Sequence, residues 1–418
     1  MPHDSPESIR ARLATIDASP VIAIAQRLIA TPSPNPPGDT SVVAQVAADI
    51  LCNAIPDIDL ALHEPTPGIV NLVARLRGHA PGRRIVLNGH LDTYPVNEAL
   101  PWTVDPLGGE LRDGKLYGRG AADMKGGIAA SIAALAALAE NRTYWQGEVV
   151  LTLAGDEESM GDQGTAWLLA NVPHARGDAV IIGDAGAPDV LRFGEKGFLW
   201  LHLHAGGKAA HGAHVHLGIN AVDRLRRALD ALAALTRLPF TAPAGVVAAI
   251  AAAKPVSEPL CGAGEAEVLG AITVNVGRIE GGTSMNLVPA AAEAWVDIRL
   301  PAGTSTARLE TAIAEALAPI AGVSCDVLRR VEPSVTAPDA EIVTLALAAA
   351  RSVMGHAPVA NMRVGGSDSR LFRKAGIPTI VYGPTPFNMG GADEYVQVAE
   401  LATVARVHAL TSFEFLRS

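Results

Sequence analysis

Two short polar clusters in this chain could carry metal chemistry. The first is His90-Leu91-Asp92 and the second is Asp156-Glu157-Glu158. Each follows an apolar run typical of a strand, so each lies where a strand ends and a loop begins. In open α/β sheets, ligands bind outside the carboxyl ends of the strands. A histidine and several carboxylates at such an edge are suitable ligands for a catalytic transition metal that keeps an open position for water.

Two further acids could complete such a site. Asp123 lies in the glycine-rich run 118–127, and Asp184 follows an apolar run that ends in Ile181-Ile182-Gly183. Each also has an ordinary alternative, because Asp123 could cap the helix expected after it and Asp184 could be a turn residue. As a carboxylate between the two clusters and a further carboxylate at a strand end, Asp123 and Asp184 are both candidate metal ligands.

Asp92 makes a ligand role for His90 more plausible. A single histidine at a strand end is more often structural than a ligand. Asp92 follows two residues later, and residues i and i+2 of an extended segment point to the same face. Asp92 can therefore hold the His90 ring, as carboxylates commonly hold metal-bound imidazoles.

The adjacent carboxylates Glu157 and Glu158 could divide two tasks between them. Their ordinary alternative is a solvated acidic turn, but the apolar strand before them and Ser159-Met160-Gly161 after them favour a buried site. Because neighbouring side chains point in different directions, one could bind a metal while the other takes a proton from the water that the metal activates.

Length and patterning predict two domains. A chain of 418 residues exceeds the usual single-core limit. Helix-type runs alternate with strand-type runs; the helices are expected at 8–30, 41–54, 125–140 and 164–171, and the strands at 69–76, 84–87 and 147–154. This alternation predicts an α/β catalytic domain with a mostly parallel sheet flanked by helices.

The pattern changes near Phe198. A strand, a helix, two strands, a helix and a strand follow in order, which is the β-α-β-β-α-β, ferredoxin-like unit. Within it, residues 240–264 show no clear period and are expected to form a surface excursion. We therefore expect a catalytic domain in two parts, 1–197 and 331–418, with an inserted lid domain at 198–330.

Composition argues against several classes of protein. The formal net charge is −10 and there is no lysine or arginine run, which argues against nucleic acid or an anionic membrane surface as a partner. Three cysteines share no short spacing, as expected for reduced cysteines in a cytosolic protein. The polar, acidic N-terminal residues are unlike a signal peptide, and no long uncharged apolar stretch predicts a membrane span. We expect a soluble, cytoplasmic protein.

Taken together, the motifs resemble the M20 metallopeptidase family, and the resemblance covers nearly the whole chain. The matching segments are Gly89 to Asp92, Gly114 to Gly127 and Asp156 to Glu158. Their combination is highly specific. A dinucleotide-binding interpretation of the run 118–127 fails, because no third glycine stands at the required spacing.

The resemblance implies the ligands of a divalent metal such as zinc, manganese or cobalt. His90 and Asp184 would bind one ion, Asp123 would bridge to a second, and Glu158 would bind that second ion. It also implies that the peptide between Asp123 and Met124 is cis.

The resemblance also implies the catalytic groups. Glu157 would be the general base, and Asp92 would orient His90. His211, in the lid, would cross a dimer interface and polarise the scissile carbonyl in the other subunit, so that the inserted lid would also be a dimerisation domain.

Substrate binding is implied for three further residues. Asn286 and Arg299 match positions that bind the carboxylate of the substrate, and Gly366 lies in a glycine turn that lines the pocket. For Arg299 the ordinary alternative is a surface strand residue, although an arginine fork suits a carboxylate well.

One position departs from the family pattern. The family usually has a metal-binding histidine three residues before the acid of a tail that is Asp393-Glu394-Tyr395 here, and the matching residue is Gly390. Glycine has no ligand atom, and the amide of Asn388 would be a weak replacement. We therefore expect one tightly bound ion per subunit, at His90, Asp123 and Asp184, with a second ion weak or absent.

The expected activity is hydrolysis of an amide C–N bond in a small, carboxylate-bearing N-acyl amino acid or dipeptide-like substrate. The missing histidine leaves a second possibility, a single-metal enzyme that hydrolyses a non-peptide C–N bond, such as the amine of an electron-poor amino-aromatic acid. A non-catalytic small-molecule binding protein is the third, although the retained cluster of candidate site residues speaks against it.

Overall fold

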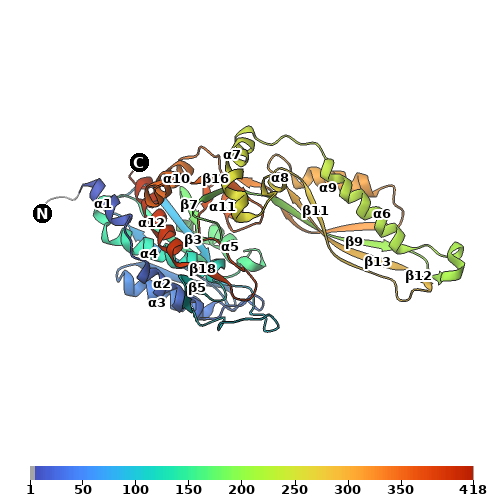
Figure 1. The fold of residues 1–418 in the computed structure, drawn as a ribbon, viewed down its shortest axis with the longest axis horizontal. Coiled ribbons are helices and arrows are strands. Elements are labelled where there is room, and N and C mark those ends of the chain that lie inside the picture. Colours follow the sequence, from blue (N-terminus) through green and yellow to red (C-terminus); the bar gives the residue numbers. More distant parts are fainter. Residues whose placement is uncertain (1–4, 418) are drawn as a thin grey trace.

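The computed structural model describes residues 5–417 and consists of a large lobe and a long arm. The large lobe contains both ends of the described chain, and the arm projects from it (Figure 1). Each part has its own hydrophobic core.

The large lobe is built around a nine-stranded sheet. Its order is β1-β2-β6-β3-β7-β17-β8-β15, with β16 also paired to β8. The central pairs β6–β3, β3–β7 and β7–β17 are parallel, and so is β8–β16, whereas the outer pairs β1–β2, β2–β6 and β8–β15 are antiparallel. The bounds are β1 Asp59–Thr66, β2 Ile69–Arg77, β3 Arg84–His90, β6 Glu148–Ala154, β7 Ala179–Ile182, β8 Val190–Glu195, β15 Ser334–Val335, β16 Val359–Arg363 and β17 Thr379–Val381.

Helices flank this sheet, as expected for strands that are apolar on both faces. The long helices α4 and α12 pack against each other, and α12 also contacts α10 and α2. Gly127, at the start of α4, lies so close to β7 that an added Cβ would overlap the carbonyl oxygen of Gly183. The helices of the lobe are α1 Pro6–Leu13, α2 Ala18–Ile29, α3 Ser41–Ala54, α4 Gly126–Glu140, α5 Thr165–Asn171, α10 Glu341–Met354, α11 Ser369–Lys374 and α12 Val398–Phe415.

The arm is the expected β-α-β-β-α-β unit, and we call it the lid. Its sheet has the order β11-β13-β9-β14, and all three pairings are antiparallel. Leu199, Leu201 and Leu203 of β9 alternate inward to a core shared with the two helices, so one face of the sheet is covered and the other is open. The elements are β9 Gly197–Gly206, α6 Ala221–Ala233, β11 Thr273–Gly281, β13 Ala291–Leu300, α9 Thr306–Leu317 and β14 Val323–Val331.

Two small sheets complete the fold. The short strands β10 (Ala210–His211) and β12 (Leu287–Val288) pair at the far end of the lid. In the large lobe, β18 (Tyr395–Gln397), β5 (Lys115–Tyr117) and β4 (Leu111–Arg112) form a three-stranded sheet.

Two expected segments differ from the structure. The single helix expected at 8–30 is two helices, because the chain leaves the helix after Leu13 and Asp17 caps a new one through Ser19. The expected excursion at 240–264 is mostly the helix α7 (Ala244–Cys261), followed by α8 (Glu265–Leu269). Helix α7 covers β16 and β8, and its Val246 and Ile250 join the core of the large lobe. Its period is obscured in the sequence because alanines occupy both faces.

Two helical segments are long and apolar enough to cross a membrane by length and composition alone. The segment Ala121–Glu140 is 83% buried inside the fold, so it packs as a core helix. Ala244–Cys261 is only 17% buried, but this helix is α7, which lies on the sheet.

Candidate metal centre and active site

The two polar clusters meet at the carboxyl end of the parallel strands. His90 ends β3, the Asp156-Glu157-Glu158 run follows β6, and Asp184 follows β7. The Nε2 atom of His90 lies 3.0 Å from Oδ1 of Asp123. One potential ligand atom each from His90, Asp123 and Glu158 lies within 4.8 Å of the other two. These three side chains therefore form a candidate metal centre.

Asp92 positions both sides of this centre. Its Oδ1 atom lies 3.4 Å from Nδ1 of His90, and its backbone oxygen lies 2.9 Å from the same nitrogen. The Asp92 carboxylate also accepts hydrogen bonds from the backbone N–H groups of Glu157 (3.1 Å) and Glu158 (3.0 Å), and from the Asn35 amide (2.8 Å). Asp92 thus holds the imidazole and the glutamate loop in one arrangement.

Asp123 is held by a distant acid. The peptide between Asp123 and Met124 is cis, as the resemblance implied. The Glu394 carboxylate accepts hydrogen bonds from the backbone N–H groups of Ala122 (2.9 Å) and Asp123 (3.3 Å), and it forms a buried ion pair with Arg119. Glu394, which lies four residues after Gly390, therefore holds the backbone that carries Asp123.

The centre carries excess buried negative charge. Burial, and then the Asp123 charge, raise the pKa of Glu158 to about 8. One oxygen of Glu158, Oε1, is buried without a hydrogen-bond partner among the described residues. The Glu158 charge and burial together raise the pKa of Tyr94 to about 12. Buried carboxylates and an orphaned oxygen need a cation to offset them, so these residues fit a divalent metal ion.

Glu157 lies beside the centre and not among its three ligand side chains. It pairs with Arg370, whose Nη1 atom lies 3.5 Å from Oε1. Burial first, and then the charge of Asp368, raise the pKa of Glu157 well above its ordinary value. A carboxylate that is half-buried, lies outside the group of possible ligands and has a raised pKa has the properties of a general base that later returns its proton.

Asp184 is present at this edge, but its carboxylate is already paired. It forms an ion pair with the guanidinium of Arg363, the last residue of β16, and it accepts a hydrogen bond from the N–H of Ala185. Burial raises the pKa of Asp123, but the hydrogen bond and charge of His90 and the charge of Arg363 outweigh it and lower that pKa. A fixed positive charge therefore lies where the family pattern would place one of two metal ions.

Gly390 lies next to Tyr94. Its φ is +75°, a left-handed conformation that glycine adopts freely, and a Cβ placed there would be 3.7 Å from Cδ2 of Tyr94. The Glu158 charge is the largest cause of the raised pKa of Tyr94, so the phenol lies close to this carboxylate. A tyrosine thus contacts the carboxylate on the side where the histidine is missing.

The three substrate-binding candidates divide into two groups. Arg299 lies 4.8 Å from the Phe198 ring, and a Cβ on Gly366 would lie 3.6 Å from that ring, so both are at the base of the lid. Asn286 lies at the opposite end of the lid, where its carbonyl accepts a hydrogen bond from the N–H of Gly212 (2.6 Å).

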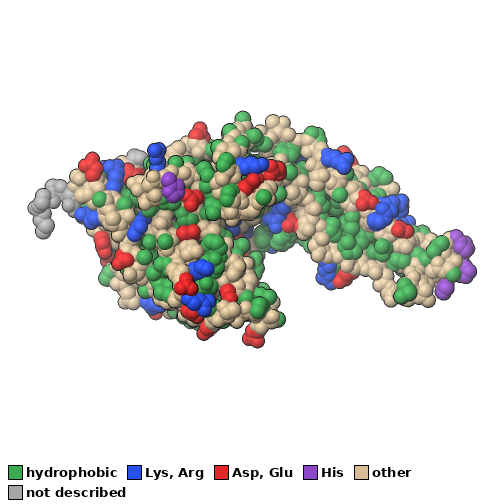
Figure 2. Space-filling view, in the orientation of Figure 1, with side chains coloured by type: hydrophobic (Ala, Val, Ile, Leu, Met, Phe, Trp, Pro, Cys, Tyr) green, Lys and Arg blue, Asp and Glu red, His purple; other side chains and the backbone are tan. Residues whose placement is uncertain are grey.

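His211 is beside Asn286, and both lie at the far end of the lid from the metal centre. It is an exposed residue of β10, opposite Leu287 of β12. Histidine side chains gather at this end of the molecule (Figure 2). The ring centroids of His211 and His214 lie 6.0 Å apart, and those of His214 and His216 lie 5.9 Å apart. Strand β12, which pairs with the β10 strand of His211, lies at the far end of the arm from β3 and β7 in the large lobe (Figure 1).

Four polar residues of this site were not among the sequence candidates: Asn35, Tyr94, Arg363 and Arg370. Arg363 ends a strand just before Gly365-Gly366, so its strand-end position was a usable signal. Tyr94 follows the first motif by two residues. Asn35 and Arg370 reach the site only through tertiary packing, and no local pattern marks them.

A cavity of about 350 Å³ opens beside the centre. Tyr94, Arg119 and Lys125 line it together with the proline-rich loop 32–36. Burial lowers the pKa of Lys125 to about 7, and its Nζ donates to the Thr31 carbonyl oxygen (2.6 Å).

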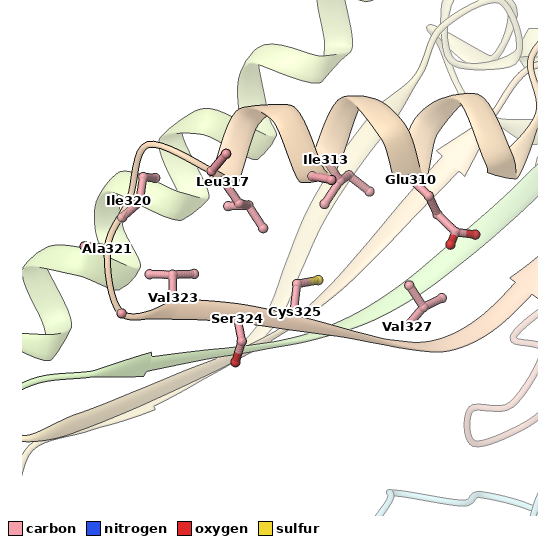
Figure 3. Close-up of a pocket in the computed structure, with 12 residues that line it drawn as sticks. Glu310, Ile313, Leu317, Ile320, Ala321, Val323, Ser324, Cys325 and Val327 are labelled. Carbon is pink, nitrogen blue, oxygen red and sulfur yellow. The ribbon is translucent and has the colours of Figure 1, made fainter.

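A groove of about 540 Å³ lies in the lid, between α9 and β14. Figure 3 shows the residues that line it; most have apolar side chains, and none is a candidate site residue.

Comparison with known proteins agrees with this geometry. Residues 86–413 match the model of peptidase family M20/M25/M40. The chain is 31% identical over 399 residues to a succinyl-diaminopimelate desuccinylase of Rhodospirillum centenum, covering 93% of this chain and 95% of the relative. It is 32% identical over 409 residues to a protein of the same name from Methylorubrum extorquens, covering 94% and 97%.

Solved structures show the same fold. An M20 family metallo-carboxypeptidase from Sulfolobus solfataricus superposes with a TM-score of 0.77 at 20% identity, covering 95% of this chain and 99% of the other. A Bacillus subtilis protein described as a dinuclear metal-binding peptidase of the M20 family superposes with a TM-score of 0.65 at 15% identity, covering 98% and 99%. The metal centre, the two-domain fold and the family match lead to one conclusion: this chain is a metallohydrolase that belongs to peptidase family M20/M25/M40.

Proposed function

We propose that the protein hydrolyses the amide bond of a small N-acyl amino acid or dipeptide-like substrate that carries a carboxylate. The relatives at 31% and 32% identity are named as desuccinylases, which remove an acyl group from an amino acid. The observation that carries the proposal is Glu157, a half-buried carboxylate next to the His90–Asp123–Glu158 centre but outside it.

The proposed chemistry assigns a task to each of the chain's groups. A divalent ion at the centre would supply Lewis-acid polarisation and an acidified water. Glu157 takes the proton of the attacking water and returns it to the leaving nitrogen, while Asp92 keeps the glutamate loop and His90 aligned. Arg299, at the base of the lid, binds the substrate carboxylate as a fork.

We propose a single tight ion at His90, Asp123 and Glu158. This differs from the expected set of His90, Asp123 and Asp184, because Arg363 neutralises Asp184 in the structure. Glycine at position 390 removes the usual histidine, and Tyr94 contacts Glu158 instead. The donor set of one imidazole and two carboxylates suits zinc, manganese or cobalt.

We propose that the active unit is a homodimer. Asn286 and His211 lie at the lid tip and Arg299 lies at the lid base, so they can serve one substrate only if the tip comes from a second copy. The edge strand β11 has unpaired backbone groups, and its Val276 and Ile279 are exposed. Two β11 edges pairing antiparallel would carry each tip toward the other subunit's lid base.

We also propose that the protein acts in the cytoplasm on a small molecule, without nucleic acid or membrane partners. The three cysteines are all free, as is usual in a reducing compartment.

Two features favour a second candidate function: Arg363 pairs with Asp184, and Gly390 stands where the family usually has a metal-binding histidine. A one-ion centre flanked by a guanidinium could hydrolyse a non-peptide C–N bond, such as the amine of an electron-poor amino-aromatic acid. The reaction would release ammonia in place of an amino acid.

One substrate panel separates these functions. The purified protein, loaded in turn with zinc, manganese and cobalt, is tested on N-succinyl, N-acetyl and N-aminoacyl amino acids and on amino-aromatic acids. Release of a free amino acid from the N-acyl compounds supports the main proposal. Ammonia from the aromatic acids alone would replace it with the second. Arg299→Met should raise KM far more than it lowers kcat if Arg299 binds the carboxylate.

A further inference from the structure

A second group of possible metal ligands lies on the open face of the lid sheet. His202 and His204 alternate with the buried leucines of β9, so both imidazoles point away from the lid core. Glu293 of β13 is directly opposite His204, and Asp326 of β14 is directly opposite His202. Three adjacent strands therefore bring two imidazoles and two carboxylates together.

The distances within this group are those of a preformed site. Nε2 of His202 lies 2.9 Å from one oxygen of Glu293, and Nδ1 of His204 lies 3.7 Å from the other. One potential ligand atom each from His202, His204 and Glu293 lies within 4.8 Å of the other two. Ligands of tetrahedral zinc are bound at about 2.0–2.2 Å, so small rotations of these side chains would bring them to one ion.

The fourth side chain has a different role. Nε2 of His204 lies 3.1 Å from Oδ2 of Asp326, while its Nδ1 faces Glu293. An Asp326 that accepts the Nε2–H proton of His204 holds the ring with Nδ1 free as a ligand. This carboxylate–histidine arrangement is the usual support of a metal-bound imidazole.

The His202 ring is fixed by stacking. It lies 4.2 Å from the Trp295 ring at an interplanar angle of 18°, and its centroid is 3.9 Å from that of His204. Two imidazoles in such close contact can both turn a ring nitrogen toward one cation. His202, His204 and Glu293 are half-buried and Asp326 is exposed, so an ion can enter from solvent.

We propose that His202, His204 and Glu293 form a second, zinc-type metal site on the lid, with water as the fourth ligand and Asp326 as the residue that orients His204. This site is separate from the catalytic centre: it lies on the lid sheet, and its ligands come from β9 and β13. An ion there links the two central strands of the lid sheet and so stabilises the arm.

Zinc stoichiometry tests the proposal. Chelator-stripped protein is titrated with Zn²⁺ against a chromophoric chelator, for the unmodified chain, His202→Ala, His204→Ala and the control His216→Ala, an exposed lid histidine outside the group. We expect both site variants to bind one ion fewer than the unmodified chain and than His216→Ala. Asp326→Asn should keep the ion count but weaken the affinity for that ion about 10-fold or more.

Two further measurements keep the result clear. Glu293→Gln preserves side-chain size, so it replaces any alanine variant that fails to fold by circular dichroism, and it should also lose one ion. In the unmodified chain, Cu²⁺ bound at the lid should quench the fluorescence of Trp295. In His202→Ala, this part of the quenching should be lost. Equal ion counts in the unmodified chain and in folded His202→Ala and His204→Ala would overturn the proposal, whether or not the catalytic centre is loaded.

Discussion

The separation of Glu157 from the ligand set makes its role testable. Glu157→Gln should keep the fold and the bound metal, because the ligand side chains we propose are His90, Asp123 and Glu158. Loss of a general base should lower kcat by about 10²–10⁴-fold. Metal content by elemental mass spectrometry and kcat are measured on the same sample, with the exposed Glu98→Gln as the control. A near-normal kcat in metal-loaded Glu157→Gln would disprove the assignment.

The pairing of Arg363 with Asp184 leads to a second prediction at the residue scale. Arg363→Met leaves the Asp184 carboxylate buried and unpaired, and breaking a buried pair in this way typically costs about 3–5 kcal/mol. A metal ion that uses Asp184 would offset this charge. We therefore expect the metal-free variant to unfold at a lower temperature, and added zinc or manganese to recover most of the loss while raising the ion count.

Arg192→Met is the matched control for this experiment. Arg192 forms a similarly buried ion pair with Glu265, away from the metal centre. The Arg192→Met variant should unfold at a lower temperature, and added metal should not restore that temperature. Equal recovery in both variants, or none in Arg363→Met, would show that Arg363 does not take the place of an ion.

At the scale of elements, the packing of α12 on α4 buries a neutral histidine. The ring of His408 lies between Ser131 Oγ (3.2 Å) and the Tyr382 carbonyl oxygen (2.7 Å), and burial lowers its pKa to about 4. An unfolded histidine titrates near pH 6.5. Between these values the unfolded chain binds more protons, so His408 makes the protein less stable as pH falls from 6.5 toward 4.

This effect can be isolated by comparing variants. From pH 7 to pH 5, His408 should reduce the free energy of unfolding by about 2 kcal/mol. His408→Gln should lower stability at pH 7 but remove this part of the pH dependence, whereas the exposed His216→Gln should leave it unchanged. Denaturant unfolding at both pH values measures the difference, and parallel pH profiles for all three proteins would contradict the prediction.

At the scale of the whole molecule, the division of site residues between the lid tip and the large lobe predicts a shared active site. His211→Ala and Glu157→Gln should each be inactive alone. After mixing, one of the two sites in each hybrid dimer regains both groups, so about a quarter of normal activity should return at equal mixing. Light scattering checks the dimer, and exchange of labelled subunits checks mixing.

Mixtures of each inactive variant with itself serve as controls. If subunits exchange and activity stays at the level of these controls, His211 does not act across a dimer interface.

The sequence by itself determined what depends on local order. Apolar runs followed by His90, by the Asp156–Glu158 run and by Asp184 place polar side chains at strand ends, because parallel strands bring their carboxyl ends to one edge. In β13, buried apolar residues alternate with mostly polar ones, and this local alternation marks a half-buried strand. The order of elements from Phe198 onward likewise predicted the β-α-β-β-α-β lid.

Only the tertiary structure decided which charges meet. Asp184 and Arg363 are far apart in the chain, and their ion pair depends on strand order. The contact of Tyr94 with Gly390 depends on how two loops fold over the centre. The register of β9 against β13 and β14 assembles His202, His204 and their carboxylates, and a shift of one residue would separate them. Local pattern sets which face a side chain occupies, whereas long-range pairing sets its neighbours, and the neighbours determine whether a carboxylate binds metal or an arginine.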